Sequence, residues 1–123
     1  MPYAYTSKGR IVHVSWYGVV TQEDLKAFVA DMPRVGRKLG FAPDVIHTFD
    51  GVTGHSFQPI AVYMYTLLQK QVQIPNPIRV AMVATTPEGQ ALAEVFKALN
   101  RMRNLEMDVF ADEPAARRWL ARP

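Results

Sequence analysis

The sequence predicts a single α/β domain over residues 1–123, in which one mixed β-sheet is covered by amphipathic helices. Three observations predict this fold class. The length is ordinary for one domain and lets the chain bury a core without disulfides. The composition, with 49% hydrophobic and 20% charged residues, is typical of globular proteins. Strand-like and helix-like segments alternate in the order β-β-α-β-α-β-α-β-α, which indicates parallel strand pairs joined to an N-terminal hairpin.

The first two strands are expected to form that hairpin. Residues 3–6 and 11–17 are rich in β-branched and aromatic side chains, and they flank a short turn that contains a glycine. In the second strand Val12, Val14 and Trp16 alternate with more polar residues. This apolar face should meet the helices.

A helix is expected to follow the hairpin directly. The hydroxyl of Thr21 can accept a hydrogen bond from an amide of the first turn. The buried stripe of this helix has members three or four residues apart: Leu25, Phe28, Val29 and Met32. Pro33 lacks the amide hydrogen that the helical ladder needs, so we expect a break or kink there, and a basic second piece that Gly40 ends.

The middle of the chain predicts a strand, a loop, a helix and a second strand. The strand covers residues 44–49 and ends at Asp50-Gly51, and the loop covers residues 52–55. The helix runs from Phe57 or Pro59 to Gln71. Residues 78–84 are almost continuously apolar, as expected of a central strand that is covered on both faces.

The C-terminal part predicts two helices around a last strand at residues 107–110. The first helix begins at Pro87, since proline at the first helical position loses only an amide that has no partner. Its apolar stripe is Leu92, Val95, Phe96, Leu99 and Met102. Asp112 caps the closing helix, which buries Ala115, Ala116, Trp119 and Leu120.

The expected helix after residue 57 is unusual because it is apolar nearly all round, over residues 60–68. A helix that covers one face of a sheet needs only part of its circumference apolar. The excess must be buried against a neighbouring helix, a second copy of the protein or an apolar ligand, and the sequence leaves these three alternatives open.

Charge and targeting signals exclude several classes of protein. The net charge is only +3, and the basic residues are scattered over expected helix surfaces, which favours solvated faces over nucleic-acid binding. The chain has no cysteine, so disulfides and thiolate chemistry are excluded. No segment approaches the roughly 18 apolar residues of a membrane span, and no signal peptide is recognisable. We therefore expect a cytoplasmic protein without a membrane span.

The polar residues do not predict a catalytic centre. His13 and Ser15 share one strand face and His47 could lie on a neighbouring strand, but side chains in this arrangement lack the in-line contact of a catalytic triad. No pair of histidines or acids has the spacing of a metal site. We expect no catalytic residue, no metal and no cofactor.

Four short motifs along the chain resemble one known superfamily. They are WYGVVT at residues 16–21, EDL at 23–25, FDGV at 49–52 and VFADEPAARRWL at 109–120. These motifs, in this order of elements, resemble the STAS superfamily of anti-sigma-factor antagonists, and especially its STAS-like branch that is related to lipid-binding proteins. The resemblance implies that Ser56 occupies the position of a serine that a partner kinase phosphorylates, with His55 in place of the usual aspartate. From the residues alone, the favoured role of Ser56 is the N-cap of the following helix.

We interpret the chain first as a non-catalytic binding or regulatory module that acts through protein–protein contact, as a homodimer. The candidate interaction surface is His55, Ser56, Phe57, Ile60, Tyr63, Met64 and Leu67. The alternative is a carrier or sensor of a small apolar or lipid-like ligand, bound between the 57–71 helix, the sheet and the segment near Pro33. The third interpretation is an enzyme, which would need His13, His47 and Ser56 within hydrogen-bond reach. An enclosed apolar cavity favours the ligand carrier, and a flat exposed patch favours the protein-binding module.

Overall fold

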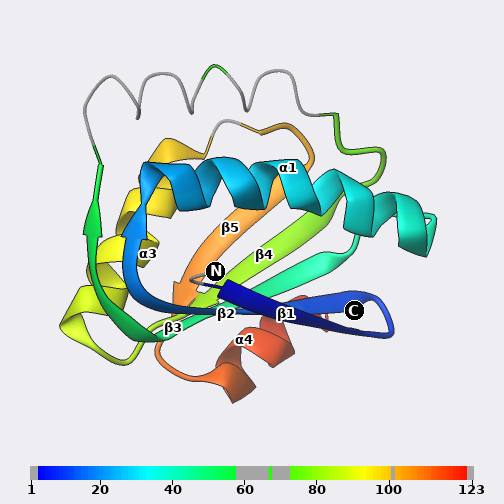
Figure 1. Cartoon of the computed structure of the whole chain (residues 1–123). Helices are drawn as coiled ribbons and strands as arrows, with labels where there is room; N and C mark the ends of the chain where they lie inside the picture. The colour runs from blue at the N-terminus through cyan, green and yellow to red at the C-terminus, as the bar shows by residue number, and fades with distance from the viewer. Residues whose placement is uncertain (1–2, 58–66, 68–72, 101, 122–123) are drawn as a thin grey trace.

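The computed structural model describes residues 3–57, 67, 73–100 and 102–121, and it has the expected α/β architecture (Figure 1). Its elements are β1 (Tyr3–Lys8), β2 (Ile11–Thr21), α1 (Gln22–Leu39), β3 (Asp44–Ser56), β4 (Ile78–Val83), α3 (Pro87–Leu99), β5 (Leu105–Phe110) and α4 (Glu113–Leu120). The sheet has the order β1-β2-β3-β4-β5, with β1 antiparallel to β2 and the other pairs parallel. Figure 1 shows α1 and α3 on one face of the sheet and α4 on the other.

The N-terminal hairpin is confirmed, and both of its strands are longer than expected. Gly9 has a φ of 61° in the turn, a conformation that glycine adopts without strain. Val12, Val14 and Trp16 are buried in the core under α1 and α3, as their alternation predicts.

Strand β3 also runs further than the sequence predicts, because it continues through the expected loop at residues 52–55 and ends at Ser56. It pairs with β2 as far as Thr21, across two register shifts. The Asp50-Gly51 pair is therefore not a turn. A Cβ atom on Gly51 would lie 3.0 Å from the Cβ atom of Tyr17, so this glycine permits the close approach of two strands at a bulge.

Helix α1 begins and ends where the sequence predicts. Thr21 and Asp24 form a reciprocal capping box, and Gly40 closes the helix with a φ of 81°. Of the expected break or kink at Pro33, the break is wrong, because the helix is continuous from Gln22 to Leu39. Apolar residues on both sides of Pro33, among them Met32 and Val35, pack on the core, which favours a continuous helix despite the missing hydrogen bond.

The sheet separates two apolar cores. Under α1 and α3 lies a large core rich in aromatic residues, which includes Trp16, Phe49 and Phe96. Under α4 lies a smaller core that includes Ile46 and Ala116. Strand β4 contributes to both, which confirms that it is a central strand covered on both faces. Met102 was expected in the apolar stripe of the helix that begins at Pro87. That helix, α3, ends at Leu99, so Met102 lies outside it.

Gly89 provides a test of how closely α3 packs on the sheet. A Cβ atom there would lie 2.8 Å from the carbonyl oxygen of Phe49 and 3.1 Å from its Cβ atom. We expect Gly89→Ala to lower the free energy of unfolding by about 1–2 kcal/mol, because overpacking outweighs the better helix propensity of alanine. Urea denaturation measures the change. Gly54→Ala is the matched control, since its Cβ atom meets nothing within 4 Å, and it should stay within about 0.5 kcal/mol of the wild type. Equal stability of both variants would contradict this packing.

Candidate functional site

A cavity of about 490 Å³ lies between α1 and the sheet. Helix α1 forms one wall, β3, β4 and β5 form the floor, and Phe96 of α3 contributes at one side. The residue segments 40–43 and 73–75 complete the lining. Most of the lining side chains are apolar, and the volume falls in the range of about 300–1,000 Å³ that is usual for small-molecule sites.

Several residues of the cavity lining have small or short side chains. From α1 the cavity is lined by Pro33 and Gly36, and from the floor by Val45 and Val80, which are partners in the β3–β4 register. Met32, Met102 and Met107 also line it, and methionine adapts its shape to an apolar guest. A hydrogen bond from the hydroxyl of Tyr3 to Asp31 anchors α1 to β1.

The loop after α1 is held in place at the edge of the cavity. The side chain of Asn76 accepts a hydrogen bond from the amide of Ala42 at 3.0 Å and donates one to its carbonyl at 2.9 Å. The guanidinium of Arg10 lies 4.1 Å from the ring centre of Phe41, a cation–π contact. Sequence reasoning missed Phe41, Ala42 and Asn76 as site residues, and the only local signal was an asparagine between two prolines.

His47 lines the floor of the cavity and is only 3% exposed. The indole N–H of Trp16 donates a hydrogen bond of 2.9 Å to its Nδ1. The imidazole stacks on Phe49 with ring centres 5.9 Å apart, and it also contacts Phe28 and Phe96. Burial lowers the pKa of His47 to about 3, with a smaller contribution from His13. The ring is therefore neutral at neutral pH, and because Nδ1 accepts, the proton resides on Nε2.

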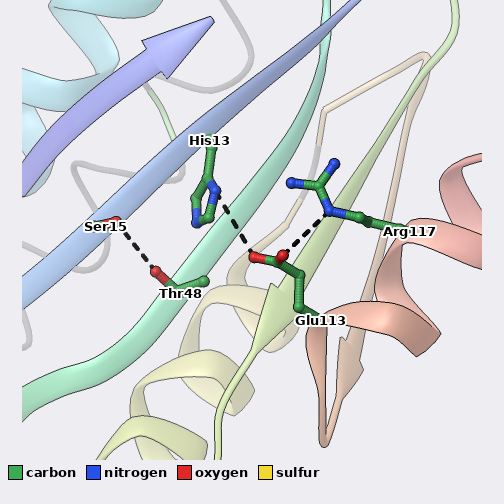
Figure 2. Close-up of polar contacts among 5 residues, drawn as sticks. All are labelled: His13, Ser15, Thr48, Glu113 and Arg117. Atoms are coloured by element: carbon green, nitrogen blue, oxygen red, sulfur yellow. Dashed lines mark hydrogen bonds and ion pairs between the residues drawn. The ribbon is translucent and has the colours of Figure 1, made fainter. Parts of the chain in front are cut away.

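A separate group of polar residues lies on the α4 face of the sheet (Figure 2). Nδ1 of His13 is 3.8 Å from Glu113, whose carboxylate also pairs with Arg117 at 3.2 Å. The hydroxyl of Thr48 donates to that of Ser15 at 3.3 Å. Figure 2 shows the two pairs side by side, and no hydrogen bond joins His13 to Ser15.

The residues considered for catalysis are not brought together. His47 is the register partner of Val14, so its side chain lies on the face of the sheet that α1 and α3 cover. The side chain of His13 lies on the other face, under α4. Ser56 lies at the far end of β3. Within the described part of the chain, no three histidine, aspartate or glutamate side chains are grouped so that they could hold a metal ion.

The predicted interaction surface is described only in part. His55 and Ser56 are exposed at the end of β3, and the rings of His55 and Phe57 are 5.1 Å apart. Leu67 is helical and half-buried. Ile60, Tyr63 and Met64, like most of the expected 57–71 helix, lie outside the described residues.

The N-cap interpretation of Ser56 is wrong. Ser56 is the last residue of a strand, where it pairs with Thr21, and Phe57 after it belongs to no helix. The extension of β3 across the expected loop moves the serine into the sheet. Its assignment as a phospho-acceptor stays a prediction.

Comparisons with known proteins identify the fold. No protein-family model matches the chain, and no curated protein does. A solved structure matches over 96% of this chain and 91% of that chain, with a TM-score of 0.56 and 16% identity. It is an uncharacterized protein of the DUF3478 family with a SpoIIAA-like fold, from Shewanella loihica PV-4. This is the STAS-like fold that the sequence motifs predict, so the resemblance is confirmed at the level of fold. None of the described helices has the length and apolar character of a membrane span.

Proposed function

We propose that this STAS-like domain binds a small apolar or lipid-like molecule in the cavity between α1 and the sheet, as a carrier or sensor without catalytic activity. The observation that carries the proposal is the cavity itself, about 490 Å³ of space lined by apolar side chains near Pro33. Of the three functions that the sequence leaves open, ligand binding needs an apolar cavity, protein contact needs a flat exposed patch, and catalysis needs polar groups that converge in a pocket.

The size of the cavity suits a ligand of moderate affinity. A guest of about 20 non-hydrogen atoms, at about 0.3 kcal/mol per atom, gains about 6 kcal/mol. This corresponds to a Kd of tens of micromolar. Flexible methionines at Met32, Met102 and Met107 favour tolerance of several guest shapes over selection of one.

The arrangement of polar groups supports binding more than catalysis. A catalytic pocket needs a nucleophile, a base and a charge-stabilising group that converge on one reacting atom. His47 reaches the cavity, but Ser15 and His13 lie on the opposite face of the sheet. This separation supports a role of His47 in binding over the activation of a serine.

Native mass spectrometry of freshly purified protein, combined with titration of the neutral dye N-phenyl-1-naphthylamine, tests the proposal. We expect saturable dye binding by the wild type, and adducts of small apolar molecules on part of the purified protein. Val80→Trp fills the cavity and should weaken dye binding at least tenfold, whereas the control Ala91→Trp introduces the same side chain at an exposed position of α3 that does not line the cavity. A bare chain that binds no dye, or equal binding by both variants, would overturn the proposal.

A second candidate function is protein contact through the end of the β2–β3 pair, in a homodimer. Tyr17 and Val19 are 46% and 55% exposed and lie two residues apart on β2, where together they offer an apolar contact. They lie beside the part of β3 that ends in His55 and Ser56. Sedimentation of the wild type should show a dimer that Val19→Asp dissociates. A wild type that stays monomeric at high micromolar concentration would refute this second function.

A further inference from the structure

The ring of His47 offers one hydrogen-bond donor on the floor of the cavity. Its Nδ1 is occupied by the indole N–H of Trp16 at 2.9 Å. A neutral imidazole has one acceptor and one donor nitrogen, so the hydrogen must reside on Nε2. The ring lines the cavity and is only 3% exposed, and Nε2 is not a fully enclosed atom without a partner, a condition that among the described side chains is met only by Nε2 of His13. Because Nδ1 is occupied and the ring borders the cavity, Nε2–H is the group of this histidine that can donate to an acceptor on a guest.

The surroundings of His47 decide which kind of acceptor fits. Phe28, Phe49 and Phe96 contact the ring, and apolar side chains line most of the remaining floor. In such surroundings an ionised carboxylate would lose its hydration without gaining a counter-charge. The cationic side chain of Arg37 also lines the cavity, but it is exposed to solvent. The other titratable group near His47 is His13, on the opposite face of the sheet.

We infer that the cavity selects apolar molecules that carry a neutral hydrogen-bond acceptor, such as the carbonyl of a ketone or ester, and that this acceptor receives the Nε2–H of His47. This inference rests on the proposed function, since it names the ligand class of the same cavity. The depressed pKa of His47 agrees with it, because a neutral imidazole is a donor without a charge that would attract a carboxylate. Trp16 has the role of a positioning residue, because its indole N–H fixes which nitrogen of His47 faces the guest.

Three probes of nearly the same shape test the inference: 2-acetylnaphthalene, 2-ethylnaphthalene and 2-naphthoic acid. Each is titrated at pH 7 against the bound dye N-phenyl-1-naphthylamine. The relevant quantity is the ratio of the ketone affinity to the hydrocarbon affinity, compared between the wild type and a variant without His47. We expect this ratio to be about five- to tenfold higher in the wild type, the size of one net hydrogen bond. The ionised acid should bind more weakly than the ketone.

The variant is the double substitution Trp16→Phe with His47→Phe, which replaces both hydrogen-bond partners with apolar rings and so avoids an unpaired buried group. Met107→Leu is the control, since it changes the cavity lining and leaves the Trp16–His47 pair intact. The infrared carbonyl band of bound 2-acetylnaphthalene is a second measurement, which does not depend on the measured affinities. A carbonyl that accepts a hydrogen bond absorbs at lower wavenumber, so the band should lie lower in the wild type than in the double variant.

The outcomes separate the inference from the proposed function. If all probes fail to displace the dye because no dye binds, both are overturned. If ketone and hydrocarbon bind with the same ratio in the wild type and the double variant, or the acid binds more tightly than the ketone, the inference is overturned and the cavity remains a binding site. A ratio that falls only in the double variant, together with the shifted carbonyl band, supports both.

Discussion

Replacement of Trp16 by alanine is expected to lower the free energy of unfolding by about 3–5 kcal/mol, the largest effect of any substitution considered for this domain. Trp16 is 1% exposed and lies at the centre of the larger core. Its ring centre is between 4.9 and 6.4 Å from those of Tyr3, Phe28, Phe49 and Phe96. Small domains are stabilised by about 5–15 kcal/mol in total, so this single change should leave little margin. Urea denaturation followed by circular dichroism measures it.

Trp16→Phe separates the packing of the ring from its hydrogen bond. It keeps an aromatic ring in the core, removes the donor to Nδ1 of His47 and loses less volume than Trp16→Ala. The expected cost is about 1–3 kcal/mol, because the buried acceptor is left without a partner. Val19→Thr is the control, since Val19 is exposed on the same strand and the change should stay within about 0.5 kcal/mol. A Trp16→Ala variant within 1 kcal/mol of the wild type would show that the ring does not organise this core.

Acidification gives the second large effect, through His47. The pKa of this histidine is about 3 in the folded domain and about 6.5 in an unfolded chain. Below pH 6.5 the unfolded chain takes up a proton that the folded domain does not take up until the pH approaches 3. The contribution to stability is therefore fully present above pH 6.5 and is lost at about 1.4 kcal/mol per pH unit as the pH falls. Between pH 6.5 and 4.5 the loss from this one group is about 2–3 kcal/mol.

The double variant Trp16→Phe with His47→Phe isolates this loss, because carboxylates elsewhere titrate equally in both proteins. Urea denaturation at pH 7, 6, 5 and 4.5 should show wild-type stability falling more steeply than that of the double variant, by about 2–3 kcal/mol over the range. Parallel profiles of the two proteins would mean that His47 is not held neutral by the fold.

The parts of the fold that local chemistry determines were predictable from the sequence. The capping box of Thr21 and Asp24, the proline at the start of α3 and the glycine in the first turn each specify a backbone conformation within a few residues. The apolar run of β4 likewise specifies burial on both faces, whatever the neighbouring strands are. These elements are confirmed because their signals do not depend on tertiary partners.

The features that depend on distant partners were not predictable. Gly51 has the sequence signature of a turn, and only the presence of Tyr17 on the neighbouring strand makes it a site of close strand approach. Pro33 has the signature of a helix break, and only packing on the sheet keeps α1 continuous. A local sequence pattern cannot show whether the local preference or the tertiary packing determines the backbone conformation, because the packing partner belongs to another element.

The candidate site shows the same limit. An apolar ligand was expected between the 57–71 helix, the sheet and the segment near Pro33. Pro33 and the sheet line the cavity, and most of that helix lies outside the described residues. The contact between Trp16 and His47 depends on the register of β2 against β3, which no local pattern specifies. The hydrogen bond between Asn76 and Ala42 at the edge of the cavity likewise joins two segments that are distant in sequence. The surface around His55 and Ser56 stays a prediction.

Nuclear magnetic resonance of protein labelled with ¹³C at the methionine methyl groups tests the central claim most directly. Met32, Met102 and Met107 line the cavity, whereas Met82 is buried in the core and does not line it. With saturating N-phenyl-1-naphthylamine, the methyl groups of Met32, Met102 and Met107 should show saturable shifts and nuclear Overhauser contacts to the dye, and that of Met82 should show none. Contacts to Met82 alone, or no contact to any of the three cavity methionines, would contradict binding in this cavity.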